Sequence, residues 1–435
     1  MTREFQKRRE KNRPSRMSND ELDANEVKYQ VLDCERPGTV FSSYTVMTKS
    51  MIGSGILSIA FACSKCGLIL GVLLLLFAAG LTWLSLHVLC KLSLAVPSRE
   101  ITFYSITDRI LPKVRTLLDI AVIMDCLGSS IAFLQTIGQL LGKCVEQLVG
   151  FGFMGPRYGV VLIQVIIVVA LFPVCLMREI SGTKYLNLIG LGGLVYVALL
   201  SIVYTDFSSI STELLYPIDS FSGISGFLIM IFAFSCQQNV LSVCTELKSP
   251  SIRKLDIITG SSIGTGFLMY LPVMVLPFLT YGRSNPNAHT FFELLPSTAA
   301  TNVGYLCAAI SVSISYVLVV HPIRRSVMSL MYGCNFPVGR KESVARTSIV
   351  SAIMCISLGV AILAGNSLGT TLEFTALLGS TTCGFLMPSI LYLKYFGWNK
   401  RSVTCWAVAG MLLLCTVLYP LGITSAIMGI VNNTG

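Results

Sequence analysis

The segment Thr48-Lys49-Ser50-Met51-Ile52-Gly53-Ser54-Gly55-Ile56-Leu57 lies in the middle of an apolar run, residues 41–66, that is long enough to cross a membrane. Two glycines separated by one serine weaken a helix, because glycine costs about 1 kcal/mol relative to alanine. Irregular backbone is tolerated at membrane depth only where it is buried in protein or lines a cavity. Its N–H groups, at the positive end of a half-helix, can bind an anion. The segment therefore predicts half of a solute-binding site.

The composition places most of the chain in a membrane. Of its 435 residues, 53% are hydrophobic and 12% are charged, whereas soluble domains contain about 25% charged residues. Apolar runs of roughly 20 residues, enough to cross about 30 Å of hydrocarbon, occur eleven times. The predicted spans are 41–66, 68–92, 118–142, 158–177, 185–205, 221–243, 257–281, 300–320, 347–366, 371–393 and 402–430. We therefore predict an all-α integral membrane protein with eleven transmembrane helices.

The distribution of lysine and arginine gives the orientation. With these spans, 27 of the 32 lysine and arginine residues fall on one side of the membrane, four fall on the other, and Lys49 lies within a span. Cytoplasmic loops carry the excess of positive charge. The N-terminus is therefore predicted in the cytosol, and the C-terminus outside the cell or in an organelle lumen. The net charge of +10 reflects this orientation and does not indicate nucleic-acid binding.

Two regions divide the chain. Residues 1–38 are polar and are predicted to form a disordered cytosolic tail, with attraction of their basic cluster to anionic lipid as the alternative. Residues 39–432 form the predicted transmembrane domain. The three histidines form no cluster with cysteine or carboxylate residues, so no metal site is expected. No titratable constellation gathers near one interface, so we expect no catalytic residues, no cofactor and no enzyme activity.

A second interruption is predicted five helices after the first. Within the span 221–243, the residues Phe234-Ser235-Cys236-Gln237-Gln238-Asn239 bring polar and small side chains to membrane depth. These groups are costly unless they face a cavity or protein. Broken helices at corresponding positions of two halves are typical of inverted-repeat transporters. The first and sixth helices are therefore the predicted interrupted pair of a five-plus-five inverted repeat, with the eleventh helix outside it.

Polar side chains in the third and eighth helices are candidates for the same site. Asp125 and Ser129 lie on one polar face of the third helix. An ionised aspartate at mid-bilayer costs about 2.5–3.5 kcal/mol, so Asp125 should face the interior. Two interpretations stay open. In the first, Asp125 carries a proton or pairs with a cationic group of the substrate. In the second, it is a protonated carboxyl or forms a structural hydrogen bond between helices. Ser311 and Ser315 share a face of the eighth helix, where serines commonly bond to the backbone.

Lys49 is the most unusual of these residues. A lysine near a helix end can extend its ammonium group to the membrane surface. Lys49 precedes Gly53 by about 6 Å of helical rise, which leaves it deep in the bilayer. We therefore predict an interior role for its ammonium group.

Five stretches, in order between residues 41 and 393, resemble the amino acid/auxin permease family. The stretches are Gly53–Ala62, like GxGILxxPxA; Phe133–Leu140, like YLxxIGDLL; Phe234–Leu247, like FxCHxxV…EL; His321–Ser326, like the end of the eighth helix; and Leu378–Tyr392, like the tenth helix. Gln237 stands where the family usually has histidine, and Gln139 replaces an acid. These departures leave the identity of a proton carrier open.

The resemblance implies the eleven-helix, LeuT-like fold and an amino-acid substrate. The substrate carboxylate would bind backbone N–H groups at the first interruption, and its ammonium would bind carbonyls freed at the second. The third, eighth and tenth helices would line the side-chain pocket. The candidate substrate-binding residues are Gly53, Ser54, Gly55, Ser129, Phe234, Ser235, Cys236 and Ser311.

The resemblance also bears on the coupling ion. Sodium-coupled members have asparagine four residues before the first glycine, whereas proton-coupled members have lysine there, as this chain does at Lys49. An ammonium at that place would fill a cation site or titrate. Proton coupling is therefore favoured, with Lys49, Asp125 and Ser315 as candidate coupling residues.

These inferences together predict a secondary active amino-acid transporter that works by alternating access. It is expected to be a monomer in the lipid bilayer that binds no nucleic acid. A vacuolar or lysosomal membrane is favoured over the plasma membrane. The alternatives are a sodium-coupled transporter and an amino-acid sensor of the same fold. The tail of about 38 residues is short and has few apolar anchors for partner proteins, which favours transport over sensing.

Overall fold

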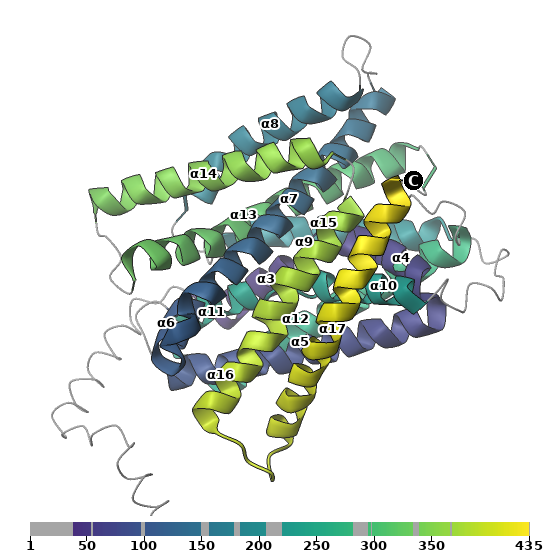
Figure 1. Ribbon diagram of the computed structural model, residues 1–435. Helices are drawn as coiled ribbons and strands as arrows, with labels where there is room; N and C mark the ends of the chain where they lie inside the picture. The colour runs from purple at the N-terminus through teal and green to yellow at the C-terminus, as the bar shows by residue number, and fades with distance from the viewer. Residues whose placement is uncertain are drawn as a thin grey trace, which may run out of the picture.

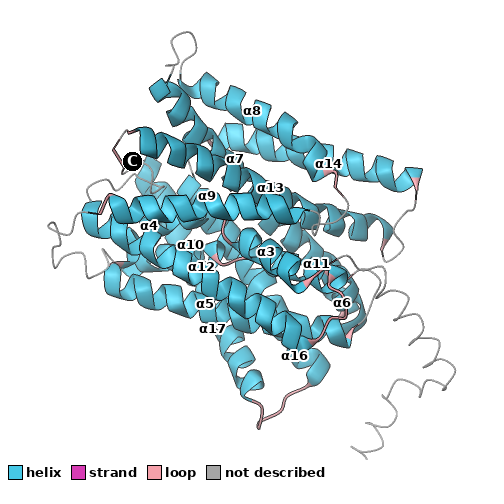
Figure 2. Cartoon of the chain, turned by 180° about the vertical axis from the view of Figure 1, so that it is seen from behind, coloured by secondary structure: helices cyan, strands magenta, loops and turns pink. Residues whose placement is uncertain are grey.

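The computed structural model describes most of the predicted transmembrane domain. The described ranges are 38–53, 55–96, 101–148, 156–177, 183–205, 220–281, 295–296, 298–333, 339–365 and 368–434. Within them the chain is helical (Figure 2), and its one strand-like contact is the bridge between Gly38 and Leu247. Ser54 and residues 1–37 lie outside these ranges, so the predictions for Ser54 and for the tail stay predictions.

The helices follow the predicted spans closely. They are α3 (Val40–Met51), α4 (Gly55–Cys66), α5 (Leu68–Ala95), α6 (Phe103–Ile110), η1 (Pro112–Val114), α7 (Arg115–Leu148), α8 (Pro156–Cys175), α9 (Lys184–Val203), α10 (Ser220–Ala233), α11 (Gln237–Glu246), α12 (Ile252–Tyr281), α13 (Ala299–Tyr332), α14 (Arg340–Ala364), α15 (Leu368–Phe374), η6 (Thr375–Ser380), η7 (Thr382–Leu386), α16 (Met387–Phe396) and α17 (Val403–Thr434). Ten helices of the described ranges can cross a membrane, or up to eleven if the bent pair α3–α4 is one span.

Both predicted interruptions are present. The helix α3 ends at Met51, and α4 begins at Gly55 after a bend of 47°. The helix α10 ends at Ala233, and α11 begins at Gln237. Glycine and polar residues at these two places therefore break the helices as their sequence indicates.

Three features differ from the predicted spans. The eighth span was expected to end at residue 320, but α13 continues through Pro322 to Tyr332. The first part of this extension lies in the core, where the buried Arg324 side chain donates to the Met177 carbonyl oxygen at 2.8 Å, and the helix becomes exposed at Met331 and Tyr332. The short helix α6, with a capping box at Thr102, was not predicted. The tenth span contains the wide π-helical turns η6 and η7, a geometry often found at functional sites.

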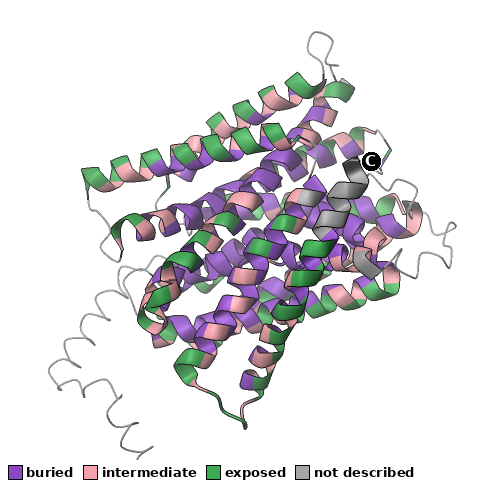
Figure 3. Ribbon diagram, in the orientation of Figure 1, coloured by how far each residue is buried: buried purple, intermediate pink, exposed green. Residues whose placement is uncertain are grey.

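The interrupted helices lie in the centre of the bundle. In an apolar stretch of 18 residues within the α10–α11 span, 94% of the residues are buried, compared with 17% in the corresponding stretch of α8. Figure 1 shows α8 and α14 side by side along one edge, and Figure 3 shows exposed residues on their outer faces. The long helices α7 and α13 pack against each other beside the centre. The broken segments are therefore enclosed by protein on most sides, as irregular backbone in a membrane requires.

We predict that Gly55→Ala destabilises the fold. A Cβ atom at Gly55 would lie 2.6 Å from the Ala233 Cα, and this neighbour is backbone that cannot turn aside. Overpacking of this kind costs about 1–3 kcal/mol, so thermal unfolding of the purified protein in detergent should begin at a lower temperature. Gly264→Ala in α12 is the control, because nothing lies within 4 Å of the position that its Cβ would take. Unfolding of Gly55→Ala at the wild-type temperature would contradict the close packing.

Candidate functional site

The two interruptions meet in the middle of the bundle. Gly55, the first residue of α4, packs directly on Ala233, the last residue of α10. The ring of Phe133 in α7 lies against Gly53, where a Cβ would be 3.0 Å from the ring. Phe234 and Cys236 of the second interruption are buried. Gly53 and Gly55 of the first predicted group thus lie in the interior, and Gly55 lies against the helix end that leads to Phe234 and Cys236 of the second.

The backbone donors at the first interruption are partly used within the chain. The Gly53 N–H donates to the Met51 carbonyl oxygen at 2.9 Å. The first N–H groups of α4, which begins at Gly55, have no acceptor within the helix, because a helix leaves its first four N–H groups without internal partners. Ser54, between them, lies outside the described residues. An anion at this place would therefore bind mainly to the start of α4.

The Lys49 side chain is fully buried and has an interior role in the structure. Its Nζ donates to the Ile52 carbonyl oxygen at 2.9 Å and to the Ser315 Oγ at 2.5 Å. Its hydrocarbon chain packs on Gly190 of α9, where a Cβ would lie 2.6 Å from the Lys49 Cε. The ammonium group therefore does not reach the membrane surface. It lies among α3, α9 and α13, against a carbonyl freed by the first interruption.

The two serines of α13 differ in their bonding. The Ser315 Oγ accepts from Lys49 and lies 3.4 Å from the carbonyl oxygens of Lys49 and of Ser311. The Ser311 Oγ is buried and has no hydrogen-bond partner within the described ranges. Ser315 is therefore engaged with the lysine, whereas the Ser311 hydroxyl has no hydrogen bond among the described residues.

Asp125 is buried inside the helix bundle, as expected because a carboxylate exposed to lipid would be costly. Its Oδ1 accepts from the Ser380 Oγ at 2.8 Å, and its Oδ2 has no hydrogen-bond partner among the residues described. Gly379 of η6 lies against its backbone, where a Cβ would be 2.5 Å from the Asp125 Cα. The Ser129 Oγ donates back to the Asp125 carbonyl oxygen at 2.9 Å. Asp125 therefore belongs to the contact between α7 and η6 and shares no hydrogen-bonding partner with Lys49.

Two residues near these groups were not singled out from the sequence. Tyr270 of α12 is fully buried, and its hydroxyl lies 2.9 Å from the Met51 carbonyl oxygen and 2.5 Å from that of Ala233. Asp119 of α7 is a second fully buried carboxyl, beside Ser326. A polar group inside an apolar span is the sequence signal for such a residue. Asp119 lies at the edge of its predicted span, and Tyr270 is one of 16 tyrosines, so neither stands out.

The half-helices α3 and α11 are joined at two levels. The Asn239 Nδ2 of α11 donates to the Ser50 Oγ of α3. Before α3, the Gly38 N–H donates to the Glu246 carbonyl oxygen at 2.9 Å, and the Lys248 N–H donates to the Gly38 carbonyl oxygen at 3.0 Å. These bonds join the two half-helices near the interruptions and again at their outer ends.

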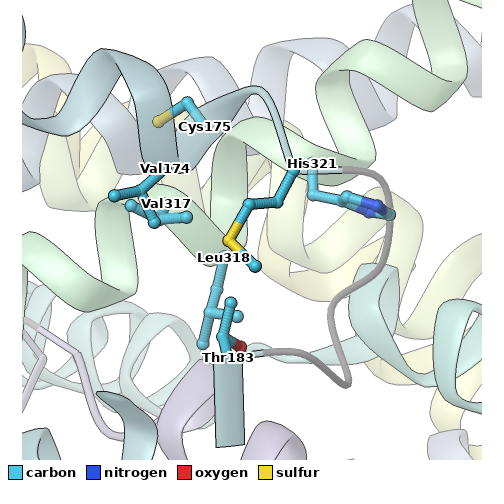
Figure 4. A pocket seen from close by; sticks show the side chains of 7 residues that line it. Val174, Cys175, Thr183, Val317, Leu318 and His321 are labelled. Carbon is cyan, nitrogen blue, oxygen red and sulfur yellow. The ribbon is translucent and has the colours of Figure 1, made fainter.

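A small pocket lies elsewhere, between α8, α9 and α13. Its lining residues are Val174, Cys175, Met177, Thr183, Val317, Leu318 and His321. Figure 4 shows these mostly apolar side chains around it. None of them belongs to the interruptions or to the Lys49 and Asp125 groups, so the pocket is separate from the candidate site.

Comparison with known proteins identifies the family. Residues 36–432 match a family described as transmembrane amino acid transporter protein. The chain belongs to this family, the amino acid/auxin permeases. The match confirms the resemblance found in the five motifs. It also confirms that the chain belongs among transporters and not among enzymes.

Individual relatives of this chain are similar at low identity. They include vacuolar amino acid transporter 7 of Saccharomyces cerevisiae, 27% identical over 68% of this chain and 60% of the relative; vacuolar amino acid transporter 5 of Schizosaccharomyces pombe, 26% identical over 83% and 85%; and solute carrier family 38 member 10 of Mus musculus, 24% identical over 86% and 35%. The chain thus spans less than two thirds of the length of the first of these relatives.

We predict that Lys49 resists chemical labelling in the folded protein. Its amine is enclosed by α3, α9 and α13, so a water-soluble amine reagent should not reach it in detergent, whereas exposed Lys341 and Lys400 should react. Mass spectrometry of the digested protein measures each modification. After denaturation in strong detergent, Lys49 should react like the other two lysines. Equal labelling of Lys49 and Lys400 in the folded protein would show that the ammonium is accessible.

Proposed function

We propose that this protein is a secondary active transporter that moves amino acids across a membrane by alternating access. The observation that carries the proposal is the meeting of two interrupted helices, α3–α4 and α10–α11, inside a bundle of the amino acid transporter family. Interrupted helices bring bare N–H and carbonyl groups to mid-membrane, where they can bind a charged solute. An amino acid carries both charges that such groups bind.

The two interruptions supply opposite partial charges. The N-terminus of α4, at Gly55, carries the positive end of a helix dipole and suits the substrate carboxylate. The carbonyl groups at Phe234–Cys236, beyond the end of α10, suit the substrate ammonium. Ser311, with its unbonded hydroxyl, and Ser129 would lie beside the substrate side chain. We propose these residues, together with Gly53, Ser54 and Ser235, as the substrate site.

The chain order of the interruptions supports the repeat architecture. In the proposed count of eleven helices, the interrupted segments are the first and the sixth. This spacing fits a five-plus-five inverted repeat of the LeuT type, with α17 outside the repeat. The 27-to-4 division of basic residues supports a cytosolic N-terminus and a C-terminus on the opposite side.

The position of Lys49 supports proton coupling. Sodium binds to protein oxygen atoms, and the Lys49 ammonium lies against two of them, the Ile52 carbonyl oxygen and the Ser315 Oγ. While it is protonated, the ammonium fills this place with a charge that belongs to the protein. Loss and gain of its proton during the cycle would then drive transport, as binding and release of sodium do in sodium-coupled members of the family. Asp125, with one unbonded carboxyl oxygen, is the second candidate carrier.

A vacuolar membrane is the proposed location, because two of the relatives named above are vacuolar amino acid transporters. An acidic lumen would supply a proton gradient for the coupling. The alternatives are sodium coupling, which the occupied position at Ser315 disfavours, and a sensor that binds amino acids without moving them. Binding without flux across the membrane would favour the sensor.

We predict that the purified protein in proteoliposomes takes up amino acids when a pH gradient is imposed, and that sodium is not required. A screen of the twenty radiolabelled amino acids at two pH values identifies the substrates. Lys49→Asn should reduce pH-driven uptake by about tenfold or more, because it removes the titrating ammonium, whereas Lys400→Asn, an exposed change, should leave uptake unchanged.

The same vesicles separate the two candidate carriers. Asp125→Asn can still accept a hydrogen bond from Ser380 through its amide oxygen. If Asp125 carries the proton, this variant loses accumulation driven by pH but still exchanges labelled for unlabelled amino acid. Uptake that needs sodium and survives Lys49→Asn would overturn the coupling proposal and leave amino-acid transport in place.

A further inference from the structure

The Tyr270 hydroxyl lies between the ends of two broken helices, each of which lacks the N–H donor that a continuous helix would supply. In a continuous helix, the Met51 carbonyl would accept from the N–H of Gly55, and the Ala233 carbonyl from the N–H of Gln237. The interruptions remove both bonds. Tyr270, from the separate helix α12, places its hydroxyl 2.9 Å from the Met51 carbonyl oxygen and 2.5 Å from the Ala233 carbonyl oxygen.

The tyrosine is held in this position by packing. It is fully buried, and its ring meets the ring of Phe234 edge to face at 5.0 Å between centroids. Phe234 is the first residue of the second interruption. The hydroxyl is therefore fixed beside both helix ends and beside the segment that we assign to the substrate ammonium.

The two carbonyl groups do not depend equally on Tyr270. A tyrosine hydroxyl has one proton and donates fully to one acceptor at a time. The Met51 carbonyl oxygen also accepts from the Gly53 N–H at 2.9 Å. The Tyr270 contact is shorter to the Ala233 carbonyl oxygen, and it takes the place of the Gln237 donor there. The Ala233 carbonyl is therefore the group that loses most without the hydroxyl.

We propose that Tyr270 is a positioning residue of the substrate site, whose hydroxyl bonds to the Ala233 carbonyl in the empty carrier and gives way to the substrate ammonium in the loaded one. This inference rests on the proposed function, because it needs an amino acid at the second interruption. An ammonium group has three N–H donors and can satisfy the carbonyl directly. In the empty protein, the tyrosine hydroxyl supplies the hydrogen bond that the Ala233 carbonyl would otherwise lack at the centre of the membrane.

The proposal distinguishes two modes of transport. Net uptake requires the empty carrier to reorient, whereas in exchange of labelled for unlabelled amino acid only the loaded carrier reorients. A buried carbonyl without a donor costs most where neither water nor substrate can reach it, which is the closed empty state through which the empty return passes. Loss of the hydroxyl should therefore slow the empty return and leave exchange nearly intact.

Tyr270→Phe tests this directly, because phenylalanine keeps the ring that packs on Phe234 and removes only the hydroxyl. The wild type and the variant are reconstituted, and the amino acid that the wild type takes up fastest in the twenty-compound screen serves as the labelled probe. We expect net uptake to fall on the order of tenfold and exchange to change by less than about twofold. Tyr316→Phe is the matched control, since it removes an equally buried hydroxyl, bonded to the Ser357 Oγ at 2.9 Å on α14. Both of its rates should stay at the wild-type values.

Equal loss of net uptake and exchange in Tyr270→Phe would overturn the proposal, and so would the absence of any change. If the variant is unstable, it is purified with and without the same amino acid. Recovery only with the amino acid supports the proposal, because the ammonium then supplies the missing donor, and failure under both conditions counts against it. A wild type that shows neither uptake nor exchange would instead refute the proposed function.

Discussion

The structure depends on one constraint, which is that each backbone polar group at the centre of a membrane needs a partner. Continuous helices meet this need internally, but the ends of α3 and α10 cannot. The Ile52 carbonyl accepts from the ammonium of Lys49, a residue of α3 itself, and the Ala233 carbonyl accepts from the hydroxyl of Tyr270 in α12. Hydrogen bonds of Tyr270 and Ser315 therefore help to place α12 and α13 around the interruptions, and α9 packs there against the hydrocarbon chain of Lys49.

Glycine allows the backbones to approach closely enough for this arrangement. Gly55 touches Ala233, Gly190 receives the hydrocarbon chain of Lys49, and Gly379 lies on the backbone of Asp125. In each case a methyl group would lie closer than 3.0 Å to a neighbouring atom. Small residues at helix contacts are general in membrane proteins, because no hydrophobic force draws the helices together and close van der Waals contact must do so. Two of these glycines, Gly190 and Gly379, also leave room for the buried Lys49 and Asp125.

Much of this fold could be predicted from the sequence, because its signals are local. Apolar runs predict the spans. Gly53 and the polar segment after Phe234 predict the two interruptions. The cost of a charge exposed to lipid predicts that Lys49 and Asp125 lie in the interior, where the structure has them. The partners of these residues were beyond prediction, since Tyr270 comes from a helix far along the chain. The π-helical turns of the tenth span and the continuation of α13 past Pro322 also depend on tertiary contacts.

The bonds between α3 and α11 have a mechanical consequence. Asn239 holds Ser50, and the strand-like pairing at Gly38 fastens the outer ends of the same two half-helices. In the proposed transport cycle, a rotation of one half-helix would therefore have to carry the other with it. A conformation with one half-helix displaced and the other in place would require these bonds to break. The pairing would thereby disfavour intermediates through which ions could leak.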